Sequence, residues 1–154
     1  MSHAPYAARR QALLERLGDG VAIIPTAAEK VRNRDTHHRF RFDSYFWYLT
    51  GFPEPEAVIV LGGDAAPRSI LCCREKNEER EVWDGYRYGP PAARETFGFD
   101  EAYPIDEFDQ RLPDLIADRP TVWHALGLDP AGAQRLMAAI NVVGGRVRAG
   151  RRAP

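Results

Sequence analysis

The sequence predicts an α/β fold in which a mixed β-sheet is flanked by helices on its faces. Segments with a helical apolar period alternate along the chain with short apolar runs that are typical of buried strands. Two of these runs, residues 57–61 and 69–73, are separated by a turn containing glycine and proline, which predicts an antiparallel hairpin. A length of 154 residues fits one domain with a full-sized core.

The first third of the chain predicts one helix, one strand and a polar connection. Residues 5–17 form the helix, because their leucines and Tyr6 fall on one helical face. The charged residues of this segment are expected to lie away from that face: Arg9, Arg10 and Glu15. Residues 21–24 form the strand, which Pro25 ends, and the charged residues 26–41 form the connection.

Residues 43–57 predict a short aromatic helix, a rigid turn and the start of a central strand. Asp43 is suited to cap the helix N-terminus, and Gly51 is suited to end it. Pro53 and Pro55 then impose extended geometry. Because large aromatic side chains dominate core burial, we expect this segment to plug the core with its aromatic residues: Tyr45, Phe46, Trp47, Tyr48 and Phe52.

The second half predicts further elements of both kinds. We expect a helical turn that reaches Trp83, a short helix over residues 91–97 and a short strand over residues 101–103. A helix beginning at Asp106 carries an apolar stripe and Pro113, which should kink it. Residues 120–124 form the last strand.

The final helix begins after Asp129-Pro130, a capping residue followed by proline in the first turn. Leu136, Met137 and Ile140 are expected to line its apolar face, and Gly144-Gly145 to end it. We therefore assign residues 1–145 to one α/β domain and residues 146–154, which carry four arginines, to the start of a linker.

Composition excludes several classes of function. The net charge of −1 gives no bulk attraction to nucleic acid or membrane, and no apolar run reaches the ~20 residues of a spanning helix. The N-terminus has no apolar signal core, so a cytoplasmic location is expected. The adjacent Cys72 and Cys73 are expected to be plain strand residues that point to opposite faces.

A search for catalytic motifs finds none of the common patterns for zinc, phosphate or serine chemistry. The adjacent His37 and His38 cannot easily reach one metal ion, and His124 is expected to be structural. Basic residues with an aromatic between them, in residues 32–41, could bind single-stranded nucleic acid, but acidic residues interrupt them. We therefore predict no catalytic residue and no metal site in this chain.

Trp83 has a different setting from the other aromatic residues. It lies in a charged stretch that Gly85 and Gly89 interrupt. Tryptophan is enriched at contact sites, and loops of this kind carry binding functions. We expect Trp83 to be exposed or interfacial.

Four stretches of the sequence resemble the N-terminal domain of Xaa-Pro aminopeptidase, also called aminopeptidase P. They are R-x-x-D at residues 32–35 with the following F-R, the run D-S-Y-F-W-Y-L-T-G-F-x-E-P-E-A at 43–57, E-x-W-x-G at 81–85, and E-x-F-G-F-D-E-A-Y-P-I-D-E-F at 95–108. Phe42 and Tyr86 stand where relatives usually carry glutamine and often carry arginine, respectively.

The resemblance implies the α/β fold of the creatinase/aminopeptidase P N-terminal domain and a specific role for this chain. It would be the non-catalytic N-terminal part of a hydrolase that removes the residue preceding proline, with two manganese ions in a separate catalytic domain. Such a domain builds a homodimer or homotetramer and forms a wall of the pocket for proline-containing peptides. The chain alone is then expected to be inactive.

By position in the resemblance, Trp83 matches a tryptophan of the substrate pocket, and Asp35 matches an aspartate at the pocket mouth. An aromatic wall would exclude water, and a carboxylate would attract the ammonium group of a peptide N-terminus. Asp35 is equally compatible with a cap or an ordinary loop acid. Two alternative functions remain at this point: the corresponding domain of a prolidase or creatinase, and a stand-alone binding module.

Overall fold

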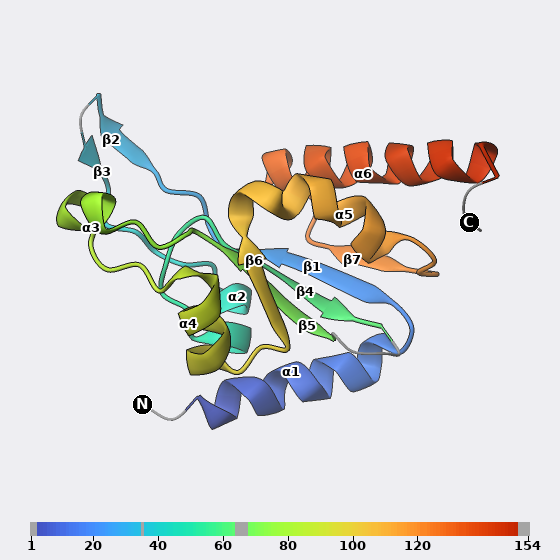
Figure 1. Cartoon of the computed structure of the whole chain (residues 1–154), viewed down its shortest axis with the longest axis horizontal. Helices are drawn as coiled ribbons and strands as arrows, with labels where there is room; N and C mark the ends of the chain where they lie inside the picture. Colours follow the sequence, from blue (N-terminus) through green and yellow to red (C-terminus); the bar gives the residue numbers. More distant parts are fainter. Residues whose placement is uncertain (1–2, 35, 64–67, 151–154) are drawn as a thin grey trace.

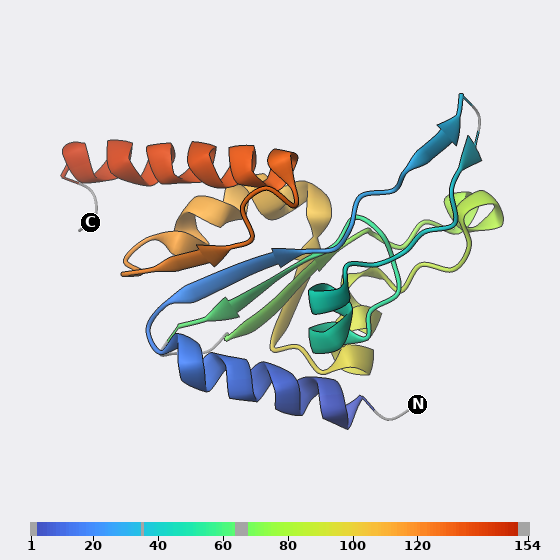
Figure 2. The same cartoon turned by 180° about the vertical axis from the view of Figure 1, so that it is seen from behind.

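A computed structural model describes residues 3–34, 36–63 and 68–150 of the chain. A five-stranded sheet, in the order β6-β5-β4-β1-β7, lies between two layers of helices (Figures 1 and 2). The expected α/β fold with a mixed sheet and flanking helices is therefore confirmed.

The sheet combines antiparallel and parallel pairs. Its strands in chain order are β1 (Val21–Pro25), β4 (Val58–Gly62), β5 (Ser69–Cys73), β6 (Glu101–Pro104) and β7 (Val122–His124). The expected hairpin is present as β4 and β5, which pair antiparallel with Val60 opposite Ile70. β1 lies antiparallel to β4, while the two outer strands β7 and β6 run parallel to β1 and β5.

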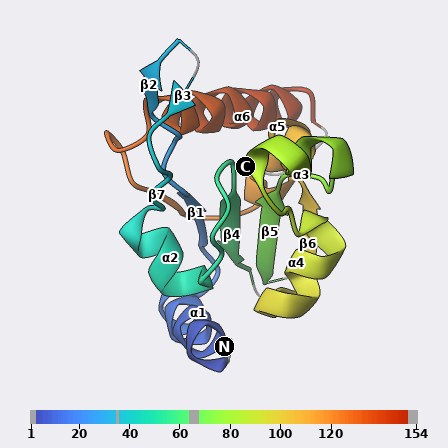
Figure 3. The ribbon, with the colours of Figure 1, turned by 90° about the vertical axis from the view of Figure 1, so that its left-hand side faces the viewer.

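Each face of the sheet has its own helices and its own core. Helices α1 (Ala4–Leu17), α2 (Ser44–Thr50) and α4 (Gly89–Phe97) cover one face, and α5 (Phe108–Ile116) and α6 (Pro130–Arg148) cover the other (Figure 3). Along β4, Ile59 and Leu61 enter the first core, and Val58 and Val60 enter the second. Burial on both faces explains why this strand is a continuous apolar run rather than an alternating one.

The two cysteines divide between these cores, as expected for neighbours on a strand. Cys73 packs in the core beneath α1, α2 and α4, and Cys72 in the core beneath α5 and α6. Both are free and fully buried. Burial raises the pKa of each thiol to about 12, so both stay protonated near neutral pH.

Arg10 is a correction to the sequence analysis, because it lies inside the protein rather than on the exposed side of α1. Only 2% of its surface is exposed. Its guanidinium donates to the carbonyl oxygens of Leu49 at 2.9 Å, Phe97 at 2.8 Å and Gly98 at 2.6 Å. It also lies over the Phe99 ring, 4.1 Å from its centroid. The helical period cannot reveal a charge whose partners are carbonyls 39 and 87 residues away.

Helix α2 is capped as expected, but only part of it enters the core. The Asp43 carboxylate accepts hydrogen bonds from the backbone of Tyr45 and Phe46, and Gly51 ends the helix in the left-handed region. Phe46 and, beyond the helix, Phe52 are fully buried. The expectation was wrong for Tyr45 and Tyr48, which are exposed, and Trp47 is only half-buried, because a helix on the surface presents one face to the core.

The polar connection after β1 contains a second, small sheet that the sequence did not reveal. Strands β2 (Val31–Asn33) and β3 (Thr36–His37) pair antiparallel. The described side chains of β2 are exposed, so no apolar alternation marks it. This hairpin and helix α3 (Glu78–Asp84) project from the same end of the main sheet (Figure 1).

Helix α6 is longer than expected. It continues through Gly144 and Gly145 to Arg148, although each glycine costs about 1 kcal/mol relative to alanine in a helix. Val143 packs against the core directly before the glycines, and Arg146 forms an exposed ion pair with Asp114 of α5 at 2.6 Å directly after them. Leu136 is buried as expected, but Met137 and Ile140 are exposed, and Ala139 takes the inward position.

The remaining helical segments lie near the expected ranges, although α5 begins at Phe108 rather than at Asp106 and the Asp129 side chain makes no capping hydrogen bond to α6. A 3₁₀ turn (Ile105–Glu107) leads into α5, which contains Pro113 as a buried residue. Within the described ranges, no helix is long and apolar enough to cross a membrane.

Replacing Arg10 by alanine should lower the free energy of unfolding by roughly 2–5 kcal/mol, since three carbonyl groups would lose a charged donor. Urea unfolding followed by circular dichroism measures this change. Arg16→Ala, at an exposed position of the same helix, is the control and should change stability by less than ~0.5 kcal/mol. Equal effects of both substitutions would contradict the anchoring role of Arg10.

The buried thiols should make stability fall in alkali. An unfolded cysteine loses its proton near its ordinary pKa of about 8.5, whereas Cys72 and Cys73 keep theirs until about pH 12. Their contribution is thus complete below about pH 8.5 and is lost as pH rises toward 12, by about 1.4 kcal/mol per pH unit for each thiol. Urea unfolding between pH 7 and 10.5 measures this slope. A Cys72→Ala/Cys73→Ala variant should show a shallower slope, and an identical slope would contradict the assignment.

Candidate functional site

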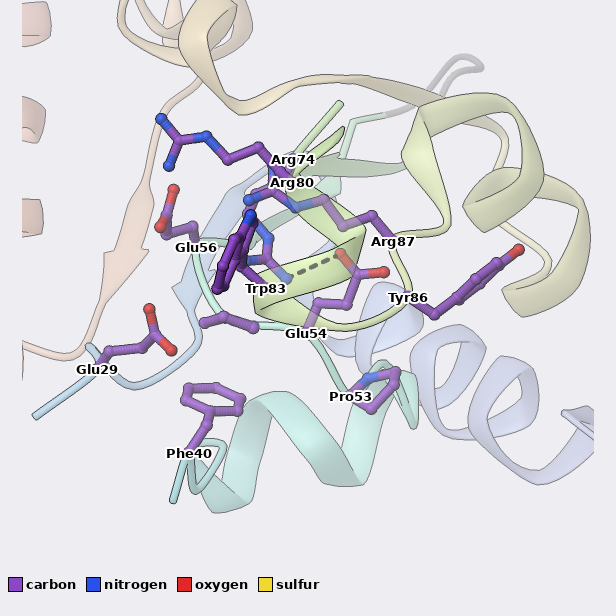
Figure 4. A pocket seen from close by; sticks show the side chains of 11 residues that line it. Glu29, Phe40, Pro53, Glu54, Glu56, Arg74, Arg80, Trp83, Tyr86 and Arg87 are labelled. Atoms are coloured by element: carbon purple, nitrogen blue, oxygen red, sulfur yellow. Dashed lines mark ion pairs between the residues drawn. The ribbon is translucent and has the colours of Figure 1, made fainter. Parts of the chain in front are cut away.

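A hollow opens beside Trp83 at the end of the sheet from which α3 projects, and we call it the Trp83 pocket. Its volume is about 700 Å³. Residues of four separate segments line it (Figure 4): Glu29, Phe40, Pro53, Glu54, Pro55, Glu56, Arg74, Arg80, Trp83, Tyr86 and Arg87. Glu29 precedes strand β2, and Phe40 follows strand β3. The pocket therefore lies between the base of the β2–β3 hairpin and helix α3.

Trp83 is held at the rim by a short, well-capped helix. The Asn77 side chain caps α3 by accepting the backbone N–H of Arg80 at 3.0 Å. Acidic residues in the first turn interact favourably with the positive end of the helix dipole. Gly85, with a φ of 83°, ends the helix two residues after Trp83. The side chain of Trp83 is 87% exposed, which confirms the expectation from the sequence.

The pocket combines aromatic surfaces with both signs of charge. Phe40, Trp83 and Tyr86 provide the rings. Three arginines and three glutamates complete the lining: Arg74, Arg80, Arg87, Glu29, Glu54 and Glu56. In Figure 4, Trp83 stands between Glu54 on one side and Glu29 and Glu56 on the other. Such a lining can hold an apolar side chain and charged or polar groups of one ligand.

Glu54 lies at the floor of the pocket and is almost completely buried, with 4% of its surface exposed. Its Oε1 accepts the backbone N–H of Tyr88 at 2.6 Å, and its Oε2 faces a guanidinium nitrogen of Arg74 at 3.5 Å. Burial raises the pKa of the Glu54 carboxyl, although the Tyr88 hydrogen bond and Arg74 oppose this effect. Among the described residues, Glu54 Oε2 and Arg74 Nε have no hydrogen-bond partner, and both atoms are buried.

A second polar cluster lies beside Trp83 on the surface. The Lys76 ammonium pairs with Glu81 at 2.8 Å and donates to the carbonyl oxygen of Arg87 at 3.2 Å, while Glu81 accepts the Arg87 backbone N–H at 2.9 Å. The hydrogen bond between Lys76 and Glu81 raises the pKa of the lysine and lowers the pKa of the glutamate.

Of the two site residues named from the sequence, the structure describes one. Trp83 lines the pocket, whereas Asp35 lies outside the described residues. His38 is exposed, and His124 is half-buried with Nδ1 3.1 Å from the carbonyl oxygen of Ile23. In the part of the chain that the structure describes, no group of three or more His, Cys, Asp or Glu side chains could hold a metal ion.

The sequence analysis missed Glu54 and Arg74 as pocket residues. A glutamate between two prolines is the one local signal, since Pro53 and Pro55 leave the intervening residue little backbone freedom. The pairing of Glu54 with Arg74, 20 positions along the chain, required the fold.

Comparison with known proteins shows which family has this architecture. A family model described as "Aminopeptidase P, N-terminal domain" matches residues 6–123. The Xaa-Pro aminopeptidase of Escherichia coli K12 is 40% identical over 130 residues, which are 82% of this chain and 30% of that protein.

Solved structures show the same similarity over the whole chain. The aminopeptidase PepP of Pseudomonas aeruginosa matches with a TM-score of 0.93 and 45% identity, over 100% of this chain and 35% of that one. Zinc-substituted E. coli aminopeptidase P in complex with product matches with a TM-score of 0.92 and 34% identity, over 100% and 36%. The chain thus spans about a third of the length of these relatives.

Trp83→Ala should change the free energy of unfolding by less than ~0.5 kcal/mol, because the ring is largely in water. Trp47→Ala should cost more, since Trp47 is half-buried and stacks on Phe42 with ring centroids 4.0 Å apart. That cost should stay below the ~3–5 kcal/mol of a core tryptophan. Urea denaturation of both variants tests this order. Unfolding of the Trp83→Ala variant would show that Trp83 is structural.

Proposed function

The chain belongs to the family of aminopeptidase P N-terminal domains, and from this premise we propose its role. It is the non-catalytic N-terminal domain of a metal-dependent Xaa-Pro aminopeptidase, and it supplies one wall of the pocket for proline-containing peptides. The observation that carries this proposal is Trp83, an 87% exposed tryptophan at the rim of a cavity of about 700 Å³.

The exposure of Trp83 is unfavourable in the isolated chain, because a large apolar ring in water forgoes the free energy of its burial. Here the ring lies on a capped helix, and Phe40 and Tyr86 line the same pocket. A peptide residue that enters the pocket would cover this ring and lose water at the same time. The wall would therefore bind substrate and exclude water without taking part in bond breaking.

The charged residues suit the rest of a peptide. The arginines of the pocket can bond a carboxylate or carbonyl groups, and the glutamates can bond amide or ammonium groups. Asp35 would attract the ammonium group of the substrate's N-terminus at the pocket mouth, as the family resemblance implies. Arginine is well suited to the first of these tasks because its fork matches a carboxylate.

We place the metal ions in the other part of the enzyme. The residues described here lack a group that fits a metal, and this chain corresponds to about a third of its relatives. The proposed parent enzyme holds two manganese ions in its catalytic domain, where they would supply an activated water. The present chain would bind and orient the peptide.

The proposal includes contacts with the catalytic domain and with neighbouring subunits. The outer strand β7 supports an interface, because Trp123 is 58% exposed on it and Leu126 and Leu128 follow in the next loop. Two adjoining hollows of about 420 and 560 Å³ share Leu13, Ile23 and Ile24 beside this strand. An apolar patch at a sheet edge is a suitable contact surface. A cytoplasmic location remains a prediction from the sequence.

In the complete enzyme, Trp83→Ala should raise KM for an Xaa-Pro peptide roughly tenfold with little change in kcat, since it removes a wall and no reacting group. Steady-state kinetics with manganese measures both constants. Val82→Ala is the matched control, because Val82 lies on the same helix, is 79% exposed and is absent from the pocket lining. Its KM should equal that of the unchanged enzyme.

Two outcomes would contradict the proposed function. An unchanged KM in the Trp83→Ala enzyme would remove Trp83 from the pocket. Hydrolysis of the peptide by the pure 154-residue chain with manganese would show that this chain is itself catalytic.

A further inference from the structure

We propose that Glu54 is a positioning residue that clamps the two ends of the segment carrying Trp83 and so sets where the tryptophan ring lies. We call residues 75–87 the Trp83 loop. The loop begins after Arg74, which directly follows β5, and it contains α3. It ends before Tyr88, which directly precedes α4. The clamp itself does not depend on the proposed function. Only the role of Trp83 in binding a peptide rests on that proposal.

The Trp83 loop has little apolar attachment to the rest of the protein beyond the Tyr86 ring, which packs edge-to-face against Tyr88 with centroids 5.0 Å apart. None of its described side chains is buried, and only Glu81 and Arg87 are half-buried. Val82 and Trp83, its large apolar residues in α3, point into solvent. Packing therefore holds the loop at Tyr86, next to its return end, and the position of α3 depends on how the two ends are held.

Both ends of the loop meet at one carboxylate. On the return side, Glu54 Oε1 accepts the Tyr88 N–H at 2.6 Å. On the outgoing side, Glu54 Oε2 faces the Arg74 guanidinium at 3.5 Å, and only 8% of Arg74 is exposed. Because one side chain contacts both ends, it fixes the separation between Arg74 and Tyr88, from which the loop extends. We call these two residues the neck of the loop.

The carboxylate itself is held rigidly. Pro53 and Pro55 restrict the backbone on either side of Glu54. Just before them, the fully buried Phe52 donates its backbone N–H to Thr50 Oγ1 at 3.0 Å. A group that is fixed before its partners arrive loses little conformational freedom in binding them.

Tyr88 also joins the return side to the core. Its ring packs against Phe97 with centroids 5.1 Å apart and against Phe52 with centroids 6.0 Å apart. The Lys76–Glu81 pair closes the loop on itself, but both residues belong to the loop, so the pair does not attach the loop to the rest of the protein. Glu54 is thus the buried polar attachment of the loop among the described contacts.

Hydrogen exchange on this chain tests the clamp without reference to catalysis. In Glu54→Ala, exchange of the amides of residues 78–88 should be at least tenfold faster, while that of β4 and β5 is unchanged. In Glu54→Gln, which keeps an acceptor for the Tyr88 N–H but loses the charge opposite Arg74, the increase should be smaller. Glu79→Gln, an exposed change within the loop, is the control and should have no effect.

Two exchange results would overturn the clamp. One is a loop that exchanges at the same rate in all variants. The other is an equal acceleration throughout the chain in Glu54→Gln, which would make Glu54 a general stabiliser. If Glu54→Ala does not fold, Glu54→Gln still decides between these results.

A double-mutant cycle in the complete enzyme then tests whether the clamp acts through Trp83. Glu54→Gln should raise KM severalfold when Trp83 is present and should have little further effect in Trp83→Ala. Independent, additive effects would mean that Glu54 acts on the substrate directly, and the positioning role would be wrong. If Trp83→Ala alone leaves KM unchanged, the proposed function fails, while hydrogen exchange still decides the clamp.

Discussion

The buried guanidinium of Arg10 is the interaction on which the arrangement of this domain most depends. A charge in a core is tolerated only when its donors are satisfied, and here the acceptors are the Leu49 carbonyl in the last turn of α2 and the Phe97 and Gly98 carbonyls at the end of α4. Both helix ends carry partial negative charge, which favours a cation there. Burial still lowers the pKa of Arg10 to about 10, where it remains charged at neutral pH. One residue of α1 thereby fixes two helices that are distant in sequence.

The geometry of the Trp83 pocket depends on the positions of α2 and α4. The segment with Pro53, Glu54 and Pro55 follows directly after α2, and Tyr88 directly precedes α4. The distance between Glu54 and Tyr88 is therefore set by the same helices that Arg10 binds. The buried part of the domain ends at Arg74 and Tyr88, and beyond them the Trp83 loop extends with no buried side chain among those described. A stable scaffold thus presents an exposed aromatic ring, as in many binding loops.

Sequence reasoning reached the fold because local and tertiary requirements agree along most of the chain. The β4–β5 hairpin, the caps of α2 and the exposure of Trp83 were all readable from short stretches. It failed where distant partners override a local pattern. Met137 and Ile140 match an apolar stripe yet lie in solvent, and α6 continues through two glycines where its Val143 packs against the core.

The sequence by itself determined the strands and helices that flank the main sheet, the caps of α2, the β4–β5 hairpin and the exposed position of Trp83, because each follows from neighbours within a few residues. Only the tertiary structure decided that Arg10 is buried and that Glu54 joins Arg74 to Tyr88. The physical reason is that a buried charge is defined by its partners. Those partners are backbone groups and side chains 20 to 88 positions away, and only the folded chain brings them within bonding distance.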